Sequence, residues 1–337
     1  MRIQSVVISA ICLSFPANIF AMCFESPRPC TWYAFHHGQP TFIGTAASEG
    51  TVPDVLKVGN NELHVTVQKV TFNVEEVFDG APTKIETVYG EGTTNDFDFK
   101  VGEKYLVYGW REKDGKIRTA RCTRTSIVSQ AEEDLQFLRS LPTRRGGEIF
   151  GTVQFVSAGS QNGALAGTIT ESGPDGEHKA SVSNSGSYEL TGLAPGDYRE
   201  TFTLDGSGAQ YVNLKVRIPV TGSCAESGFR LGNIPVSGRV IGDAGNALPG
   251  ATVTLFYALD GQYHPDVFLR TQTDSSGEFS FSYVEPAKFI LAAQPKNSTI
   301  TFFPSTQDSS KTDVIQTEDG RPLRGLIVQV RGSSHSN

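Results

Sequence analysis

The chain has 337 residues with a formal net charge of −7, and it contains 35 Gly and 17 Pro but only two Met. This length accommodates two or three domains. The turn-forming residues, together with recurring runs rich in Val, Thr, Phe and Tyr, favour an all-β protein over a helical one. An acidic chain with no basic stripe cannot displace the counterions of a phosphate backbone, which argues against nucleic-acid binding.

Residues 1–21 are predicted to be a cleavable secretory signal peptide. Arg2 provides the positive start, Val6 to Phe15 an apolar stretch, and Ala21 a small residue for cleavage. The apolar stretch is too short to span a bilayer. Met22 stands where a lipoprotein signal requires a small residue before Cys23. We therefore expect cleavage after Ala21 and a protein that is secreted, periplasmic or displayed at the cell surface.

The cysteines are expected to form disulfides in that oxidising compartment. Cys12 is removed with the signal peptide, which leaves Cys23, Cys30, Cys122 and Cys224. Four cysteines allow two disulfides with three connectivities. No Cys-x-x-Cys or Cys-x-x-His spacing occurs, so disulfides are favoured over a metal site.

The first structured region is predicted to be a small closed barrel preceded by an irregular leader over residues 23–33. Alternating apolar residues run through residues 63–74, and the phase changes at Gln68-Lys69. A bulge there would bend the strand, as a closed barrel requires. Further strands are expected over residues 85–89, 105–110 and 117–122, with Asp114-Gly115 forming the hairpin between the last two.

One helix is expected to close this region. Ser129 and Glu132 have the spacing of a capping box. Leucines then recur at positions 135, 138 and 141, and Pro142 stops the helix. Residues 143–148 are interpreted as a linker, because they contain Gly146-Gly147 and two arginines.

The remainder is predicted to be two tandem β-sandwiches, over residues 149–232 and 233–331, followed by a tail over 332–337. In both, a turn glycine is followed by an aromatic residue two places later, a proline nine places later and a second aromatic twelve places later. The glycines are Gly186 and Gly277, a separation of 91 residues. Each repeat has the length of a seven-stranded sandwich.

Family resemblances add to this interpretation. The second repeat resembles the carboxypeptidase regulatory-like domain, a non-catalytic transthyretin-like sandwich, over Gly238-Arg239-Val240, residues 248–253 and residues 274–289. The first repeat looks like a divergent copy. Residues 22–142 resemble the bacterial version of the netrin-like domain of tissue inhibitors of metalloproteinases, which is an OB-type barrel. That resemblance is carried by Cys30 with Tyr33, Phe42 with Gly44, Gly102 with Tyr105-Leu106-Val107-Tyr108, Cys122 with Thr125, and the closing helix.

The second resemblance implies a pairing of the cysteines. The family usually opens with a Cys-x-Cys pair, but here only Cys23 is present, and Asn95 occupies about the place of the other cysteine's partner. Cys23 would then pair with Cys122. This leaves Cys30 and Cys224, and a bond between them would tie the barrel to the first sandwich.

The same resemblance suggests an inhibitory edge at Cys23. Animal members of the family block metalloproteases because the amine and carbonyl of an N-terminal cysteine chelate the catalytic zinc. Cleavage after Ala21 would leave Met22 in front of Cys23 and prevent this chelation. Inhibition of a secreted metalloprotease is therefore the alternative function.

No catalytic, cofactor-binding or metal-binding residue is predicted. The chain has no Gly-x-Ser-x-Gly elbow, His-Glu-x-x-His helix, phosphate-binding glycine loop or dinucleotide motif. The pair His36-His37 is interpreted as an exposed loop pair rather than as metal ligands. Aromatic residues of the second repeat could form a binding face, but their alternation favours a place in the core; they are Phe279, Phe281, Tyr283 and Phe289.

The sequence thus predicts an exported, non-enzymatic binding or structural protein of the cell envelope or extracellular space. Its partner would be an unidentified protein or carbohydrate. No nucleic acid, cofactor or transmembrane segment is expected.

Overall fold

The computed structural model describes residues 28–58, 61–93, 95–156, 166–206, 209–259, 262–318 and 320–330. The predicted signal peptide, Cys23 and the tail over 332–337 lie outside these ranges. The chain divides into two compact units. Unit 1 contains Gly38–Leu135, and unit 2 contains Arg28–His37 together with the chain from Gln136 onward. Within the described ranges, no helix has the length and apolar character needed to cross a membrane.

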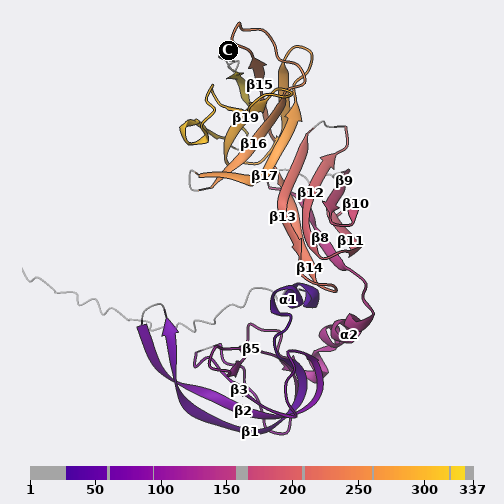
Figure 1. Ribbon diagram of the computed structural model, residues 1–337, viewed down its shortest axis with the longest axis vertical. Helices are drawn as coiled ribbons and strands as arrows, with labels where there is room; N and C mark the ends of the chain where they lie inside the picture. The colour runs from indigo at the N-terminus through magenta and orange to yellow at the C-terminus, as the bar shows by residue number, and fades with distance from the viewer. Residues whose placement is uncertain are drawn as a thin grey trace, which may run out of the picture. The chain divides into compact units, whose positions relative to one another are not determined.

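Unit 1 is built on a seven-stranded sheet that curves into a half-barrel (Figure 1). The strand order is β5-β6-β3-β2-β1-β4-β7. The core under this sheet is aromatic, with Phe42, Phe72 and Phe99 at most 5% exposed. The strands are β1 (Thr41–Val58), β2 (Asn61–Asp79), β3 (Ile85–Tyr89), β4 (Lys104–Tyr108), β5 (Trp110–Arg111), β6 (Ile117–Arg118) and β7 (Ser126–Ile127).

The bend in the long β1–β2 hairpin does not arise where the sequence predicted it. Val67 and Val70 are both buried, so the apolar phase does change between them. The pairing with β1 nevertheless runs unbroken past Gln68 and Lys69, and its register shifts lie elsewhere, one of them between Ala46 and Ser48 of β1. The prediction was wrong because a bulge in either strand can change the alignment of a pair, and the phase of one strand cannot tell which.

Two helices are described, and one of them was not expected. Helix α1 (Pro29–His36) occupies the predicted irregular leader. Its apolar residues lack helical periodicity, but proline is favoured at the first position of a helix, where its missing N–H costs nothing. Helix α2 (Glu132–Ser140) confirms the predicted closing helix. It begins two residues later than the capping box implied, because Ser129 lies in the 3-10 turn η1 (Val128–Gln130). A second 3-10 turn, η2 (Leu141–Thr143), follows α2.

Unit 2 contains one nine-stranded sheet and two three-stranded sheets. The nine-stranded sheet runs β10-β9-β12-β13-β17-β16-β19-β20, with β21 also paired to β19. One three-stranded sheet has the order β11-β8-β14 and the other β18-β15-β22. In each, the first pair is antiparallel and the second is parallel.

In the described part of unit 2, the strands from β8 onward follow each other without a long helix between them. They are β8 (Gly147–Phe155), β9 (Gly167–Gly173), β10 (Gly176–Ser181), β11 (Ser187–Leu193), β12 (Gly196–Leu204), β13 (Gln210–Ile218), β14 (Cys224–Leu231), β15 (Ile234–Ile241), β16 (Thr252–Leu259), β17 (Gln262–Gln272), β18 (Glu278–Val284), β19 (Lys288–Gln294), β20 (Thr301–Phe302), β21 (Val314–Gln316) and β22 (Leu323–Gln329), with a 3-10 turn η3 (Ser309–Lys311). The predicted all-β class, a barrel-like sheet followed by β-sandwiches, is confirmed.

The two sandwiches share a sheet and a continuous core. Strands β8–β14 form the first sandwich and β15–β22 the second. Strand β13 of the first pairs with β17 of the second, side by side in Figure 1. Apolar residues of both sandwiches belong to one buried cluster. The turn glycines Gly186 and Gly277 have φ of 81° and 75°, a left-handed conformation that favours glycine over other residues.

Candidate functional site

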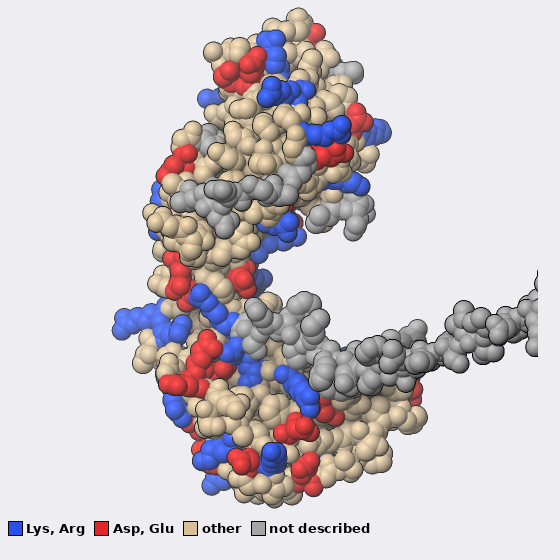
Figure 2. All heavy atoms as spheres, turned by 180° about the vertical axis from the view of Figure 1, so that it is seen from behind, with Lys and Arg blue, Asp and Glu red and all other residues tan. Residues whose placement is uncertain are grey.

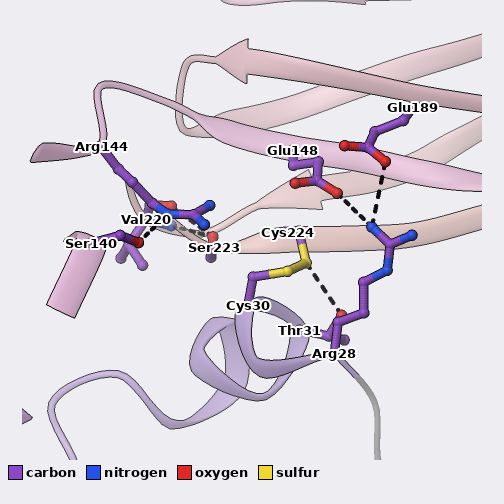
Figure 3. The surroundings of a disulfide bond; sticks show 10 residues. All are labelled: Arg28, Cys30, Thr31, Ser140, Arg144, Glu148, Glu189, Val220, Ser223 and Cys224. Carbon is purple, nitrogen blue, oxygen red and sulfur yellow. Dashed lines mark hydrogen bonds and ion pairs between the residues drawn. A yellow bond between two sulfur atoms is a disulfide. The ribbon is translucent and has the colours of Figure 1, made fainter. Parts of the chain in front are cut away.

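The structure contains the disulfide between Cys30 and Cys224. Cys30 lies in the first turn of α1, and Cys224 is the first residue of β14 (Figure 3). The hydroxyl of Thr31 lies 3.3 Å from the Cys224 Sγ. Both cysteines belong to unit 2, so the bond fastens α1 to the sheet within that unit.

Arg28 adds a second attachment beside this bond (Figure 3). Its Nη1 donates to Glu148 Oε1 at 2.7 Å and lies 3.6 Å from Glu189 Oε2. Its guanidinium carbon is 3.8 Å from the ring centroid of Phe150, which is a cation–π contact. Burial, followed by repulsion from Glu189, raises the pKa of Glu148 above its ordinary value. Arg28, Thr31 and Glu148 beside the disulfide each have a structural partner, and we interpret this region as a clamp.

The other predicted disulfide cannot be followed to its partner. Cys122 is disulfide-bonded, but Cys23 lies outside the described residues. The Cys23–Cys122 pairing and the inhibitory edge at Cys23 therefore stay predictions.

The histidine pair is not the exposed loop pair that the sequence predicted. His36 is the last residue of α1, and its ring centroid lies 3.9 Å from a ring of Trp32. Burial and then the neighbouring His37 lower the pKa of His36. Only His37 is exposed and outside the helix. Across the described ranges, no cluster of three or more His, Cys, Asp or Glu side chains has the arrangement to hold a metal ion.

The aromatic residues of the second repeat do not form a binding face. Phe279, Phe281 and Phe289 are 3%, 0% and 0% exposed and lie in the shared core. This confirms the interpretation of their alternation as core packing. Tyr283 packs partly buried against the same core.

A cleft lies instead at the seam between the two sandwiches. Strands β13 and β17 pair over four residues, from Gln210 opposite Arg270 to Asn213 opposite Val267. Beyond these residues the described parts of the two strands make no further backbone pairs, and a cavity of about 310 Å³ opens beside them. This volume is at the lower end of the ~300–1,000 Å³ typical of small-molecule sites. Its walls come from β13, β14, β16 and β17: Tyr211, Val212, Lys215, Gly228, Phe229, Arg230, Tyr257, His264, Asp266, Val267, Phe268 and Leu269, with Glu285 after β18.

Aromatic rings form the walls of this cleft. Tyr211 and Phe229 are nearly fully buried, and their ring centroids are 6.5 Å apart. Tyr257 and Phe268 are partly exposed. The Tyr211 hydroxyl donates to the carbonyl of Tyr283 at 3.1 Å, which leaves the ring as its contribution to the cleft.

Charged groups of both signs border the aromatic walls. The Tyr257 hydroxyl donates to Glu285 Oε1 at 2.7 Å, and Arg230 Nε donates to Glu285 Oε2 at 3.0 Å. Burial and the Glu285 charge raise the pKa of Tyr257 well above its ordinary value, so this hydroxyl remains a donor. Lys215 forms an ion pair with Asp266. The side chains of Lys215 and Arg230 are 70% and 69% exposed, so both are accessible from solvent.

Sequence reasoning did not find this cleft. Its aromatic residues stand on four different strands, and Tyr211, Tyr257 and Phe268 each adjoin another apolar residue in the sequence, as core residues often do. No local spacing distinguishes Tyr257 or Phe268 from a residue of the core. The only available signal was composition, since tyrosine and phenylalanine are frequent in the chain, with 10 and 21 residues.

The face drawn in Figure 2 shows no broad area of one charge. On the face drawn in Figure 2, Lys and Arg are interspersed with Asp and Glu. This distribution gives no stripe of basic residues on that face for a nucleic acid to follow.

Comparisons with known proteins give only distant likenesses. No family model matches the chain, and no curated protein matches it. Among solved structures, the Bacillus anthracis TIE protein is 12% identical with a TM-score of 0.22, covering 87% of this chain and 50% of that chain. The chain thus spans about half the length of that protein.

Two further structures resemble parts of the chain. The minor pilin GBS52 of Streptococcus agalactiae is 10% identical with a TM-score of 0.23, covering 57% of this chain and 98% of that chain. The second is the dioxygenase domain of a dioxygenase carbohydrate-binding protein fusion from Streptomyces sp. SirexAA-E. It is 17% identical with a TM-score of 0.20, and the match covers 29% of this chain and 79% of that chain. At these TM-scores the likeness assigns neither a fold nor a function to the chain.

Proposed function

We propose that this protein is an exported, non-catalytic binding protein and that its ligand is a carbohydrate bound in the cleft between the two sandwiches. The observation that carries the proposal is the cleft itself, in which aromatic walls adjoin accessible charged groups. The organisation that fits this function is an N-terminal barrel of the netrin-like kind followed by two carboxypeptidase regulatory-like sandwiches. The cell envelope or the extracellular space is its proposed location.

The chemistry of the cleft matches that of a sugar ring. A sugar has apolar faces that pack on flat aromatic rings, here those of Tyr257 and Phe268. Its hydroxyl groups both donate and accept hydrogen bonds. Lys215 and Arg230 offer donors, and Asp266 offers an accepting carboxylate. Because these charges already pair with one another, the cleft carries no large net charge and suits a neutral ligand.

Binding should be measured by titration calorimetry against a panel of soluble oligosaccharides from bacterial envelopes and plant cell walls. We expect at least one to bind with a saturable isotherm. The double variant Lys215→Ala/Arg230→Ala should weaken binding at least tenfold without unfolding the protein, because both side chains are mostly exposed. Phe268→Leu should also weaken it at least tenfold, because it keeps an apolar side chain but removes the flat ring.

The matched control is Arg217→Ala. Arg217 lies two residues from Lys215 on β13, has a side chain that is 71% exposed, and does not line the cleft. Its substitution should leave binding unchanged. The carbohydrate proposal fails if no oligosaccharide in the panel binds, if the Lys215, Arg230 and Phe268 variants bind as well as the native chain, or if only peptides compete for the cleft.

A further inference from the structure

A row of polar side chains crosses the interior of the first sandwich. Strands β10, β9, β12 and β13 lie side by side, and their register places His178 opposite Glu171, Glu171 opposite Glu200, and Glu200 opposite Asn213. Directly opposed residues of neighbouring strands point to the same face of a sheet. Glu171 and Glu200 are both 0% exposed, so two carboxyl groups stand next to each other in the core.

Among the described residues, the facing sheet provides hydrogen-bond donors to Glu200 but not to Glu171. The Tyr188 hydroxyl from β11 donates to Glu200 Oε1, and the Ser227 hydroxyl from β14 donates to Glu200 Oε2. Asn213 Nδ2 donates in turn to Ser227 Oγ at 3.2 Å. Gly151 of β8 makes space for this cluster, since a Cβ there would lie 2.7 Å from the Tyr188 hydroxyl oxygen. Glu200 therefore has the surroundings of an ionised carboxylate.

Glu171, in contrast to Glu200, has no hydrogen-bond donor among the described residues. Within the described part of the chain, neither of its buried carboxyl oxygens has a hydrogen-bond partner. His178, its neighbour on β10, instead has its Nε2 3.1 Å from Asp175 Oδ1. Two ionised carboxylates are both acceptors and cannot bond to each other. A proton on Glu171 would supply the missing donor and remove one of two adjacent buried negative charges.

We propose that Glu171 and Glu200 hold one proton and one negative charge between them, with the proton on Glu171, and that this pair makes the first sandwich more stable in acid than at neutral pH. The pair would thus make the stability of the first sandwich depend on pH from within its core. It would strengthen an exported domain when its surroundings become acidic.

The electrostatics of the surrounding groups agree with this assignment. Burial, followed by the charge of the neighbouring Glu200, raises the pKa of Glu171 well above its ordinary value of 4.5. Burial and the Glu200 charge also raise the pKa of Tyr188, so its hydroxyl stays a donor. On β12, Tyr198 directs its hydroxyl to Asp175 and to the Ala194 carbonyl rather than to Glu171. Among the described residues, the histidine opposite Glu171, His178, pairs with Asp175 and gives no hydrogen bond to Glu171.

The direction of the pH dependence follows from this shift. The folded state keeps the Glu171 proton above pH 7, whereas an unfolded glutamate releases it near its ordinary pKa of 4.5. The pair's contribution to stability is therefore fully present below that pH and is lost as the pH rises toward the folded-state pKa. From about pH 5 to pH 8, this group alone should raise the unfolding constant by up to about tenfold per pH unit.

Infrared difference spectroscopy on the full-length mature protein tests the proton directly. Spectra of native protein minus Glu171→Gln at pH 7 should show the carbonyl stretching band of a protonated carboxyl group. The same band should be absent from the difference between native protein and Glu177→Gln. Glu177 lies on β10 with a side chain that is 63% exposed. Absence of a protonated carboxyl band from the spectrum of the native protein alone at pH 7 would overturn the proposal, and that spectrum does not require any variant to fold.

Chemical unfolding at pH 5 and pH 8 tests the effect on stability. Glu171→Gln should lower the unfolding constant at pH 7 by roughly 10- to 300-fold, since an amide needs no proton to stay neutral. It should also reduce the change in stability between pH 5 and pH 8. Glu177→Gln should keep the native profile. A Glu171→Gln protein whose stability and pH profile match those of the native chain would contradict the acid-strengthening proposal.

Discussion

At the scale of single residues, buried polar groups in unit 1 are held in a closed network. Asp134 accepts from Arg124 at both carboxylate oxygens, at 2.6 Å from Nε and 2.8 Å from Nη2. It also accepts from the Tyr108 hydroxyl at 2.8 Å. The side chains of Arg124 and Asp134 are only 8% and 9% exposed. A bidentate pair in this position is strong because both charges are desolvated and fully hydrogen-bonded.

Asp134→Ala should therefore destabilise unit 1 by about 3 kcal/mol, because it leaves the Arg124 guanidinium buried with its main partner removed. Denaturant unfolding followed by tryptophan fluorescence measures the change. Asp98→Ala is the control, since Asp98 and its partner Arg121 have side chains that are 88% and 52% exposed. Exposed pairs contribute little. Equal effects of the two substitutions would show that the buried network does not stabilise the unit.

At the scale of elements, helix α1 depends on its attachments. It has eight residues, which is shorter than the roughly 12–15 that an isolated helix needs to be even marginally stable in water. Its buried residues are Pro29, Cys30 and Ala34. The helix lacks a broad apolar face to pack on the sheet. The disulfide to Cys224 and the ion pair of Arg28 with Glu148 attach it to the sheet instead.

The double variant Cys30→Ala/Cys224→Ala should lose about 2–5 kcal/mol of stability, because the bond closes a long stretch of chain, with a sequence separation of 194. Scanning calorimetry measures the loss. Limited proteolysis should then cut within Pro29–His36 in the variant and leave this segment intact in the native protein. Proteolysis at equal rates in both proteins would mean that noncovalent contacts alone hold α1.

At the scale of the whole molecule, the proposed binding function and the inhibitor alternative differ at the N-terminus. Zinc chelation requires the free amine of Cys23 itself, and any residue in front of it removes that amine. The carbohydrate proposal places the ligand at the seam of unit 2 and does not depend on the first residue.

We predict that the exported protein begins at Met22. N-terminal sequencing of protein recovered outside the cytoplasm checks this. A chain that begins at Cys23 would instead restore the chelating group and favour metalloprotease inhibition. That result would then call for a direct inhibition assay, in which Cys23→Ser, expected to remove the activity, is compared with the native protein.

Much of the fold could be predicted because its signals are local. The turn chemistry at Gly277 and the alternation of Phe279 and Phe281 fix a tight turn and the buried face of the strand that follows it within a few residues. The helix ending before Pro142 follows from leucine spacing in the same way. Helix α1 was missed because its stability comes from Cys224, which lies far along the chain, and not from its own pattern.

The candidate site and the carboxyl pair could not be predicted. Glu171 and Glu200 are unremarkable in the sequence, because any single glutamate in a strand is expected to face solvent. They become adjacent in the core only through the register of β9 with β12. The cleft likewise depends on the pairing of β13 with β17, which joins two segments that the sequence assigned to separate sandwiches.

The sequence by itself determined the all-β class, the position of the closing helix and which aromatic residues of the second repeat are buried. These follow from periodicity and turn chemistry, which act between near neighbours in the chain. Only the tertiary structure decided that two sandwiches share a sheet and a cleft, and that two carboxyl groups meet in the first of them. Those features arise from strand pairing between distant segments, whose partners no local pattern specifies.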